Sequence, residues 1–271
     1  MSKTVIITGA SSGFGRETAK IFQKKGWNVV ATMRSPENEQ ELSKLENVFV
    51  IRLDVQDADS IQNAVKEAIQ HFGSIDVLVN NAGFGLMGVF ESSTPEQIRK
   101  QYAVNVFGLM DVTRAVLPQM RRQSNGTIIN ISSFGGQVGL PFGSLYNSSK
   151  FAVEGFSESL SHEVSTFGIS VKVIEPGGVA TNFRNGLEMI KNEVPEYNPI
   201  MDNFFGRYQS TTAHLPKATP EDVAQTIYEA ATDDKTQLRY IIGEDARFYI
   251  DTKYKNSDPA FIKIMRDRFV N

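Results

Sequence analysis

The hydrophobic positions of the chain fall into two kinds of segment. Short runs rich in β-branched residues are apolar at nearly every position, which is typical of strands buried on both faces. These runs occupy residues 4–8, 27–33, 48–53, 75–80, 126–132, 169–175 and 238–243. Longer segments with apolar residues at helical spacing lie between them, at residues 15–26, 60–73, 95–123, 149–168 and 220–234.

This alternation of strand and helix predicts the fold. Strands that are apolar throughout and joined by helices form parallel sheets covered on both faces. We therefore expect an α/β, Rossmann-type doubly wound fold with a mostly seven-stranded parallel sheet and right-handed crossovers. The sequence has no internal repeat or linker, so we expect a single domain over residues 1–271. The alternation breaks at about residues 182–215, an aromatic and methionine-rich segment that we expect to be a substrate lid.

Residues at several expected helix ends are of types that cap or terminate helices. Threonine followed by proline offers an N-cap at Thr94 and at Thr219. Asp59 or Ser60 can cap the helix that follows the third strand. Glycine, which adopts the left-handed conformation of a helix end without strain, stands at three expected ends, Gly26, Gly73 and Gly168.

Composition and charge exclude several functions. A net charge of −3 gives no field that would draw the chain to nucleic acid or to anionic lipid. The chain has no cysteine, and its three histidines lack a metal-ligand spacing, so we expect no metal site and a reducing compartment. The first residues enter a strand without the features of a signal peptide, and no apolar run is long enough to span a membrane. We therefore expect a cytoplasmic protein with no nucleic-acid or membrane partner.

The first candidate site is the sequence TGASSGFGR, which follows the first strand and opens the first helix. Gly9, Gly13 and Gly15 leave backbone N–H groups unobstructed at a helix N-terminus, where a pyrophosphate binds well. The spacing is GxxxGxG and differs from the common GxGxxG fingerprint. An ordinary glycine-rich turn is the alternative interpretation.

The end of the second strand bears on the choice of cofactor. Dinucleotide sites often place an acid there to hold the ribose 2′-hydroxyl group. In the sequence ATMRSPE no acid occupies residues 31–35, and Arg34 stands there instead. A cation suits a 2′-phosphate, to which Ser12 could add a hydroxyl group, so NADP(H) is favoured and NAD(H) is possible. The alternative is that Arg34 is a solvated loop residue.

Tyr146 and Lys150 are the candidate proton-transfer pair. Four residues apart on a helix, their side chains emerge on the same face. A nearby ammonium group favours the phenolate, so we expect Lys150 to lower the pKa of Tyr146 toward the working pH. The phenol could then act as a general acid toward a carbonyl oxygen or as a base toward an alcohol.

The same spacing occurs a second time in the chain, so spacing alone decides nothing. Tyr249 and Lys253 repeat it, and Thr236 lies thirteen residues before that tyrosine, in a polar run. Ser133 lies thirteen residues before Tyr146 and directly follows a strand. Ligands of open α/β sheets bind at the carboxyl ends of strands, and this context favours the first pair.

Ser133 has a role in this interpretation, because its hydroxyl group can hold the substrate oxygen. Ser132 is the neighbouring candidate, but successive strand residues point to opposite sides, so only one of the two can serve. The thirteen-residue spacing favours Ser133. A serine that satisfies backbone groups at a strand end is the alternative.

These residues together resemble the short-chain dehydrogenase/reductase family. The resemblance covers residues 4 to about 181, with a looser similarity to the hydroxysteroid and retinol dehydrogenase-like branch. Its motifs, in the order of the family, are Thr8-Gly9-Ala10-Ser11-Ser12-Gly13-Phe14-Gly15, Asp54-Val55, Asn80-Asn81-Ala82-Gly83, Asn105, Ser133, Tyr146-x-x-x-Lys150 and Pro176-Gly177.

The resemblance implies a role for each residue. Tyr146 would exchange the proton, Lys150 would lower its pKa and bind the nicotinamide ribose, Ser133 would position the carbonyl, and Asn105, at a helix irregularity, would hold a relay water. The implied cofactor-binding residues are Gly9, Ser11, Ser12, Gly13, Phe14, Gly15, Arg34, Asp54, Val55, Asn81, Ala82, Gly83, Tyr146, Lys150, Pro176, Gly177, Val179 and Thr181.

The substrate side is predicted to be apolar. Residues 139–142 are expected to form one wall. Apart from Arg184 and Arg207, no cation is obviously placed to bind a small charged acid near the lid, so such a substrate is disfavoured. Core or interface packing is the alternative for each aromatic residue. The expected lid residues are Phe183, Leu187, Met189, Ile190, Tyr197, Ile200, Met201, Phe204, Phe205 and Tyr208.

In the family, the two long helices at residues 95–124 and 146–167 pair across a two-fold axis. The resemblance therefore implies a homodimer or a homotetramer, although core packing competes for each apolar residue on these helices. The candidate interface residues are Val104, Phe107, Val112, Val116, Phe151, Phe156 and Leu160.

The leading functional hypothesis is an NADP(H)-dependent carbonyl reductase or alcohol dehydrogenase whose partner is a small carbonyl or alcohol substrate. A regulator that binds NADP(H) without turnover is the main alternative. Epimerisation or dehydration of a nucleotide sugar is disfavoured, because such chains usually open with GxxGxxG and carry a longer C-terminal region.

Overall fold

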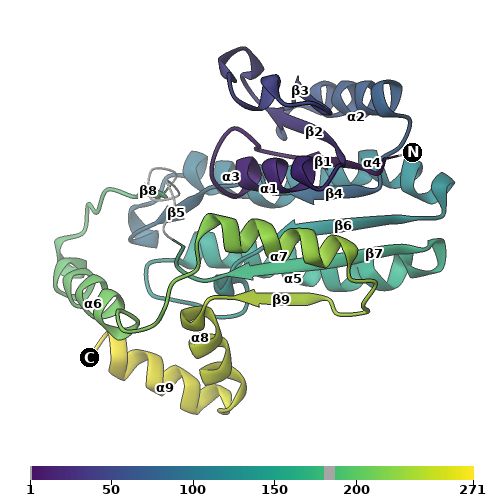
Figure 1. Ribbon diagram of the computed structural model, residues 1–271. Coiled ribbons are helices and arrows are strands. Elements are labelled where there is room, and N and C mark those ends of the chain that lie inside the picture. Colours follow the sequence, from purple (N-terminus) through teal and green to yellow (C-terminus); the bar gives the residue numbers. More distant parts are fainter. Residues whose placement is uncertain (1, 180–186) are drawn as a thin grey trace.

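A computed structural model describes residues 2–179 and 187–271, and its centre is a parallel sheet of seven strands in the order β3-β2-β1-β4-β6-β7-β9 (Figure 1). Every neighbouring pair in this sheet is parallel. The strands are β1 Thr4–Ile7, β2 Asn28–Met33, β3 Val48–Arg52, β4 Val77–Asn80, β6 Gly126–Ile131, β7 Ile169–Pro176 and β9 Arg239–Ile242. All seven predicted strands are therefore confirmed, each within two residues of its expected ends.

Helices cover both faces of the sheet, as the doubly wound prediction requires (Figure 1). Helices α1 and α7 pack on one face, and α2, α4 and α5 pack on the other. The helices are α1 Gly13–Lys24, α2 Ala58–Phe72, α3 Pro95–Tyr102, α4 Leu109–Gln123, α5 Ser144–Val164, α6 Asn198–Thr211, α7 Pro220–Thr232, α8 Glu244–Tyr254 and α9 Asp258–Phe269.

Two short strands and three helices were not predicted from the sequence. The strands β5 Gly85–Met87 and β8 Leu187–Met189 form a separate two-stranded parallel sheet, and each is too short to show a period. Helices α6, α8 and α9 lie together beyond one end of the main sheet, around a cluster of aromatic side chains (Figure 1). Their apolar residues face this local cluster, so their pattern differs from that of helices packed on a sheet.

The caps follow the predicted chemistry with one correction. Thr94 and Thr219 each accept a hydrogen bond from the third residue of their helix in a capping box. The three predicted helix-ending glycines have positive φ, between +68° and +84°. The cap of α2, however, is Asp57, whose carboxylate accepts from the N–H of Ser60 at 3.0 Å, and neither Asp59 nor Ser60 fills this role.

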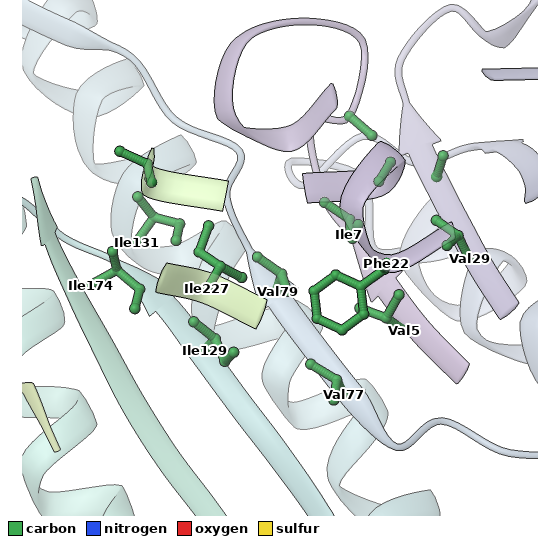
Figure 2. Close-up of a cluster of buried hydrophobic side chains, with 14 of the residues drawn as sticks. Val5, Ile7, Phe22, Val29, Val77, Val79, Ile129, Ile131, Ile174 and Ile227 are labelled. Carbon is green, nitrogen blue, oxygen red and sulfur yellow. The ribbon is translucent and has the colours of Figure 1, made fainter. Parts of the chain in front are cut away.

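One core lies on each face of the sheet. On the α1 and α7 side, Phe22 and Ile227 pack onto strand residues of β1, β4, β6 and β7 (Figure 2). The ring of Phe22 is fully buried and meets Trp27 and Tyr228 edge-on, with centroids 5.0 Å and 5.2 Å away. This aromatic contact joins α1 to α7 and holds the helix whose N-terminus carries the glycine-rich turn.

Truncation of the Phe22 side chain should strongly destabilise the fold. We expect Phe22→Ala to lower the free energy of unfolding by about 3–5 kcal/mol, because it removes a fully buried ring and leaves a cavity. Chemical denaturation followed by circular dichroism measures the loss. Phe167→Ala is the matched control, because that ring is 44 % exposed and should cost less than about 0.5 kcal/mol. Equal losses in the two variants would contradict the packing described here.

The strand order reverses direction between β1 and β4. From β1 the chain proceeds to β2 and β3 on one side, and from β4 to β6, β7 and β9 on the other. Ligands of open α/β sheets bind in the crevice at the carboxyl ends of the strands beside such a reversal. The fold therefore places the site between the loops that follow β1 and β4.

Candidate active site

The turn after β1 has a backbone shape that suits a phosphate. Gly9 and Gly13 have φ of +68° and +54°, where glycine is favoured. A Cβ atom at Gly15 would lie 2.5 Å from the carbonyl oxygen of Gly9, so the turn closes tightly only around glycine. Ser12 is the N-cap of α1, but its side chain makes no capping hydrogen bond. The first turn of α1 therefore presents N–H groups at the positive end of the helix dipole, as a pyrophosphate site requires.

The loop after β4 is fastened to this turn. The hydroxyl oxygen of Thr8 accepts from the backbone N–H groups of Asn81 and Ala82 at 2.9 and 3.0 Å. The side-chain amide of Asn81 donates to the carbonyl oxygens of Thr8 and Gly9 at 2.9 and 3.1 Å. The residues after β1 and β4 that were predicted to bind the cofactor are thus brought together where the strand order reverses.

Arg34 lies at the same edge, directly after β2. Its side chain is exposed and forms no ion pair with a described residue. Two of the acids that follow it in the sequence bind another cation, because Arg16 contacts Glu39 at 2.5 Å and Glu41 at 2.8 Å. The guanidinium group of Arg34 is consequently available to an anion beside the glycine turn.

Asp54 and Val55 follow β3, one strand further out. Asp54 accepts from the backbone N–H of Gln56 at 3.0 Å and holds its own turn. Val55 is 9 % exposed and packs against Gly108, so most of its side chain belongs to the core. Both residues lie at the edge where the adenine end of a dinucleotide would be expected.

Ser133 and Tyr146 are brought together. Ser133 follows β6, and its hydroxyl oxygen accepts from the N–H of Gly135 at 3.1 Å. The same hydroxyl group forms a hydrogen bond with the phenol of Tyr146, which lies in the first turn of α5. The hydroxyl group of Ser132 is buried on the other side, beside Gly136. The geometry therefore favours Ser133, as the thirteen-residue spacing predicted.

The pKa of Tyr146 and the position of the Lys150 ammonium group differ from the prediction. Burial raises the pKa of the Tyr146 phenol, and the hydrogen bond with Ser133 opposes this only in part. The ammonium nitrogen of Lys150 donates to the carbonyl oxygen of Ile131 at 2.8 Å and lies 5.8 Å from the centroid of the Tyr146 ring. The phenol pKa is therefore raised, and the predicted net lowering is wrong, because burial outweighs the stabilisation that a nearby cation gives the phenolate. The phenol stays protonated at neutral pH.

Lys150 itself is strongly affected by its surroundings. Burial lowers its pKa to about 8, while the carboxylate of Glu154, one turn further along α5, raises it. The pKa of this ammonium group therefore lies close to neutral pH, where small changes in nearby charge alter its protonation.

Asn105 lies in a π-helical turn, Ala103–Gly108, between α3 and α4. Its amide nitrogen donates to the carbonyl oxygen of Phe84 at 2.9 Å and to the hydroxyl group of Ser149 at 3.3 Å. Its amide oxygen accepts from the N–H of Phe84 at 3.1 Å. The helix irregularity implied by the resemblance is confirmed, and the side chain joins the loop after β4 to α5.

The segment after β7 is held by a residue that the sequence analysis missed. Asp245, in the first turn of α8, accepts from the N–H of Gly178 at 2.7 Å. A Cβ atom at Gly177 would lie 2.1 Å from its carboxylate oxygen, so this close approach requires glycine. Pro176, Gly177 and Val179 thus lie at the site edge, while Thr181 falls outside the described residues.

Other missed residues are buried polar side chains around the site. A signal existed for two of them, since Glu154 and Glu175 each place an acid within an apolar run, KFAVEGF and VKVIEPG. Gln101 and Gln137 gave no comparable signal. Gln101 is fully buried and bonds the backbone of Phe84 and Leu86.

The expected lid residues have mixed positions. Ile190 and Phe204 are 4 % and 1 % exposed, so they belong to the core and do not form an open lid. Phe205 and Tyr208 are half-buried, and the ring of Phe205 stacks on Phe142 of the expected opposite wall. Phe183 and Arg184 fall outside the described residues.

The expected interface residues divide in the same way. Val112, Val116 and Leu160 are buried in the core of the chain itself, so they are not available to a second copy. Phe107 and Phe151, in contrast, are 59 % and 40 % exposed. Core packing is therefore the correct interpretation for these three of the seven candidate interface residues.

Two further observations bear on the class of protein. Within residues 2–179 and 187–271, no group of three His, Cys, Asp or Glu side chains is placed to hold a metal ion. The same part of the chain has no helix whose length and hydropathy would allow it to cross a membrane.

Known proteins resemble the chain over most of its length. The family model for short chain dehydrogenases matches residues 3–190. An oxidoreductase of Schizosaccharomyces pombe is 42 % identical over 235 residues, which are 86 % of this chain and 98 % of that protein. A 3-ketodihydrosphingosine reductase of Bacteroides thetaiotaomicron is 43 % identical over 182 residues, 66 % of this chain and 65 % of the relative.

Solved structures agree with this assignment. A short-chain dehydrogenase from Streptomyces avermitilis has a TM-score of 0.85 and 35 % identity, and the match covers 94 % of this chain and 93 % of the other. ElxO with NADP bound has a TM-score of 0.74 and 29 % identity, with 89 % and 96 % covered. With the glycine turn and the Ser133–Tyr146–Lys150 arrangement at one edge of the sheet, the chain belongs to the short-chain dehydrogenase/reductase family and is an oxidoreductase that acts on CH–OH groups with a nicotinamide dinucleotide.

Proposed function

We propose that the chain is an NADP(H)-dependent carbonyl reductase, or alcohol dehydrogenase in reverse, for a rather apolar substrate. The observation that carries the proposal is the protonated phenol of Tyr146, hydrogen-bonded to Ser133 at the carboxyl edge of the sheet. A buried phenol that keeps its proton at neutral pH is suited to protonate a carbonyl oxygen.

The residues present fit a dinucleotide. The N–H groups of the glycine turn and the Ser12 hydroxyl group would hold the pyrophosphate, and the loop after β4 would line the adenosine side. Lys150, Gly177 and Val179 would surround the nicotinamide end. When bound, the nicotinamide supplies or accepts the hydride.

Side chains of the protein then position the carbonyl oxygen and transfer the proton to it. Ser133 positions the carbonyl oxygen by a hydrogen bond, and Tyr146 donates its phenolic proton to that oxygen as the carbonyl carbon is reduced. Lys150 stabilises the phenolate that remains, since a cation favours the charged form of a nearby phenol. Asn105 fixes the loop and the helix between which proton exchange with solvent would occur.

The preference for NADP(H) rests on Arg34. We expect Arg34→Asp to lower the preference for NADPH over NADH by about 10- to 100-fold, because a 2′-phosphate would lose a cation and meet an anion. Steady-state kcat/KM with each cofactor measures the ratio. Arg34→Lys is the matched control, since it keeps the charge and should retain most of the preference. An unchanged ratio in the aspartate variant would remove the argument for the phosphate.

The substrate class is inferred from the aromatic residues near the site. Phe142, Phe205 and Tyr208 gather beside the segment that carries Ser133, and one relative of the chain is a 3-ketodihydrosphingosine reductase. These observations favour an apolar ketone or secondary alcohol. A panel of aliphatic, aromatic and charged ketones, assayed by loss of NADPH absorbance, tests the class.

The same assay separates the alternative function. A regulator that binds NADP(H) without turnover would bind the cofactor and reduce no ketone of the panel. The Ser133–Tyr146 hydrogen bond favours the enzyme, because a binding module has no need of a proton donor beside the nicotinamide.

The assembly and location are further proposals. We infer a homodimer or homotetramer, supported by the exposed rings of Phe107 and Phe151 on neighbouring elements, and a cytoplasmic protein with no nucleic-acid or membrane partner. Sedimentation of the wild type against a Phe107→Glu, Phe151→Glu variant tests the assembly, since two added charges should dissociate an interface there.

A further inference from the structure

A buried polar cluster behind the active site joins its three parts. Glu154 lies on α5 one turn after Lys150, and Glu175 lies on β7 directly before Pro176-Gly177. Gln137 follows the short turn that begins after Ser133, and its amide nitrogen donates to Glu175. The cluster thus joins the segment after Ser133, the helix that carries Tyr146 and Lys150, and the strand that ends in Pro176-Gly177.

One guanidinium group serves several carboxylates around this cluster. Glu154 and Glu175 are 5 % and 0 % exposed. Arg239 of β9 is the guanidinium group that faces them, 3.0 Å from Glu154 and 3.6 Å from Glu175, and it also binds the exposed Glu158 at 2.6 Å. Glu175 shares this guanidinium group with two other carboxylates, so an ionised Glu175, fully buried, would be poorly compensated and destabilising.

The hydrogen bonds lead to the same conclusion. Oε1 of Glu154 and Oε2 of Glu175 are buried and receive no donor from the described residues. The two side chains nevertheless lie within hydrogen-bonding reach of each other. Two carboxylates cannot bond without a proton, whereas a protonated Glu175 can donate to Glu154 and satisfy both oxygen atoms.

We propose that Glu154 and Glu175 share one proton at neutral pH, so that the pair carries a single negative charge, and that this charge keeps the buried Lys150 ammonium group protonated beneath Tyr146. Both acids are then positioning residues that act through Lys150. The second part rests on the proposed function, in which Lys150 supports proton transfer.

The electrostatics agree with this arrangement. Burial, followed by the Glu154 charge, raises the pKa of Glu175 to about 8. Burial lowers the pKa of Lys150, and the Glu154 carboxylate opposes that effect. Among the described residues, the titratable and charged groups that contact the pair or act on it are Lys150 of α5, Glu158 of α5 and Arg239 of β9, and, through Gln137, Lys253 and Tyr254 of α8.

The shared proton has a consequence for stability that needs no turnover. The unfolded chain loses the Glu175 proton near pH 4.5, whereas the folded chain holds it to about pH 8. Glu175 therefore contributes stability that is complete below the unfolded pKa and is lost as the pH rises through the folded pKa. In Glu175→Gln this contribution is absent, so the melting temperature of the wild type should fall relative to this variant between about pH 5 and pH 8.

The charge on Lys150 is tested by two neighbouring isosteric changes. Glu154→Gln removes the negative charge and should move the alkaline limb of kcat/KM for ketone reduction to lower pH by about 0.5–1 unit. Glu175→Gln keeps the charge on Glu154, and below about pH 8 Glu175 is itself protonated in the wild type, so this variant should shift the limb less than Glu154→Gln does. The pH dependence of NADPH affinity, read by nucleotide fluorescence, should move in parallel and requires no substrate.

The outcomes are distinct. Equal pH limbs in the two variants would overturn the link to Lys150, and a melting difference independent of pH would overturn the shared proton. The expected melting and affinity results in a chain that reduces no ketone would support the charge arrangement while contradicting the proposed function.

Discussion

Tyr146→Phe is expected to lower kcat for ketone reduction by about 10³-fold or more, because it removes the proton donor and leaves the ring in place. NADPH binding should persist, since the glycine turn and Arg34 are untouched. Stopped-flow or steady-state loss of NADPH absorbance measures the rate, and nucleotide fluorescence measures the affinity. Activity equal to the wild type would reject Tyr146 as the acid.

The chain supplies its own matched control for this variant. Tyr249 has the same spacing to a lysine, Lys253, but its ring is 1 % exposed and stacks on Phe134, and its hydroxyl group is buried without a described hydrogen-bond partner. Tyr249→Phe removes only that buried hydroxyl group, so turnover should change by less than about threefold. A loss as large as that of Tyr146→Phe would mean that the repeated spacing had been assigned to the wrong pair.

Lys150→Met should give the second largest loss, about 10²-fold or more in kcat, together with weaker NADPH binding. The variant removes the cation that stabilises the phenolate and leaves the Glu154 carboxylate without a neighbouring ammonium group. Because Lys150 has a pKa of about 8 in the folded chain, the wild type should show an alkaline limb near that pH that the variant lacks.

Lys172→Met controls for the loss of a buried lysine as such. Lys172 is 3 % exposed and donates to backbone carbonyl groups, as Lys150 does, but it lies by Asp233 and Tyr240, away from the crevice. This variant should lose stability and keep its pH profile. If both lysine variants lost kcat equally, the effect of Lys150→Met would be structural.

The order of motifs along the chain was enough to predict which residues meet. The glycine turn, the loop after β4, Ser133 and Pro176-Gly177 each follow a buried strand, and parallel strands bring their carboxyl ends to one edge. The thirteen-residue spacing to Tyr146 likewise selected Ser133 over Ser132. These conclusions depend on local periodicity and covalent spacing, which the sequence records directly.

The direction of the Lys150 side chain could not be read from spacing. A separation of four residues places Tyr146 and Lys150 on one helix face, but it does not say that a carbonyl group of β6 lies within 2.8 Å of the ammonium nitrogen. Burial likewise depends on what packs above the helix. For these reasons the sign of the Tyr146 pKa shift was predicted incorrectly.

By itself, then, the sequence determined the seven-stranded doubly wound fold, the family and the identities of the residues at the crevice, because hydrophobic period and motif order are local properties. Only the tertiary structure decided which apolar residues are core and which are exposed, that Asp245 holds the loop after β7, and that Glu154 and Glu175 meet behind Lys150. Acids 21 positions apart on a helix and a strand become one titrating pair only when the fold removes water from between them.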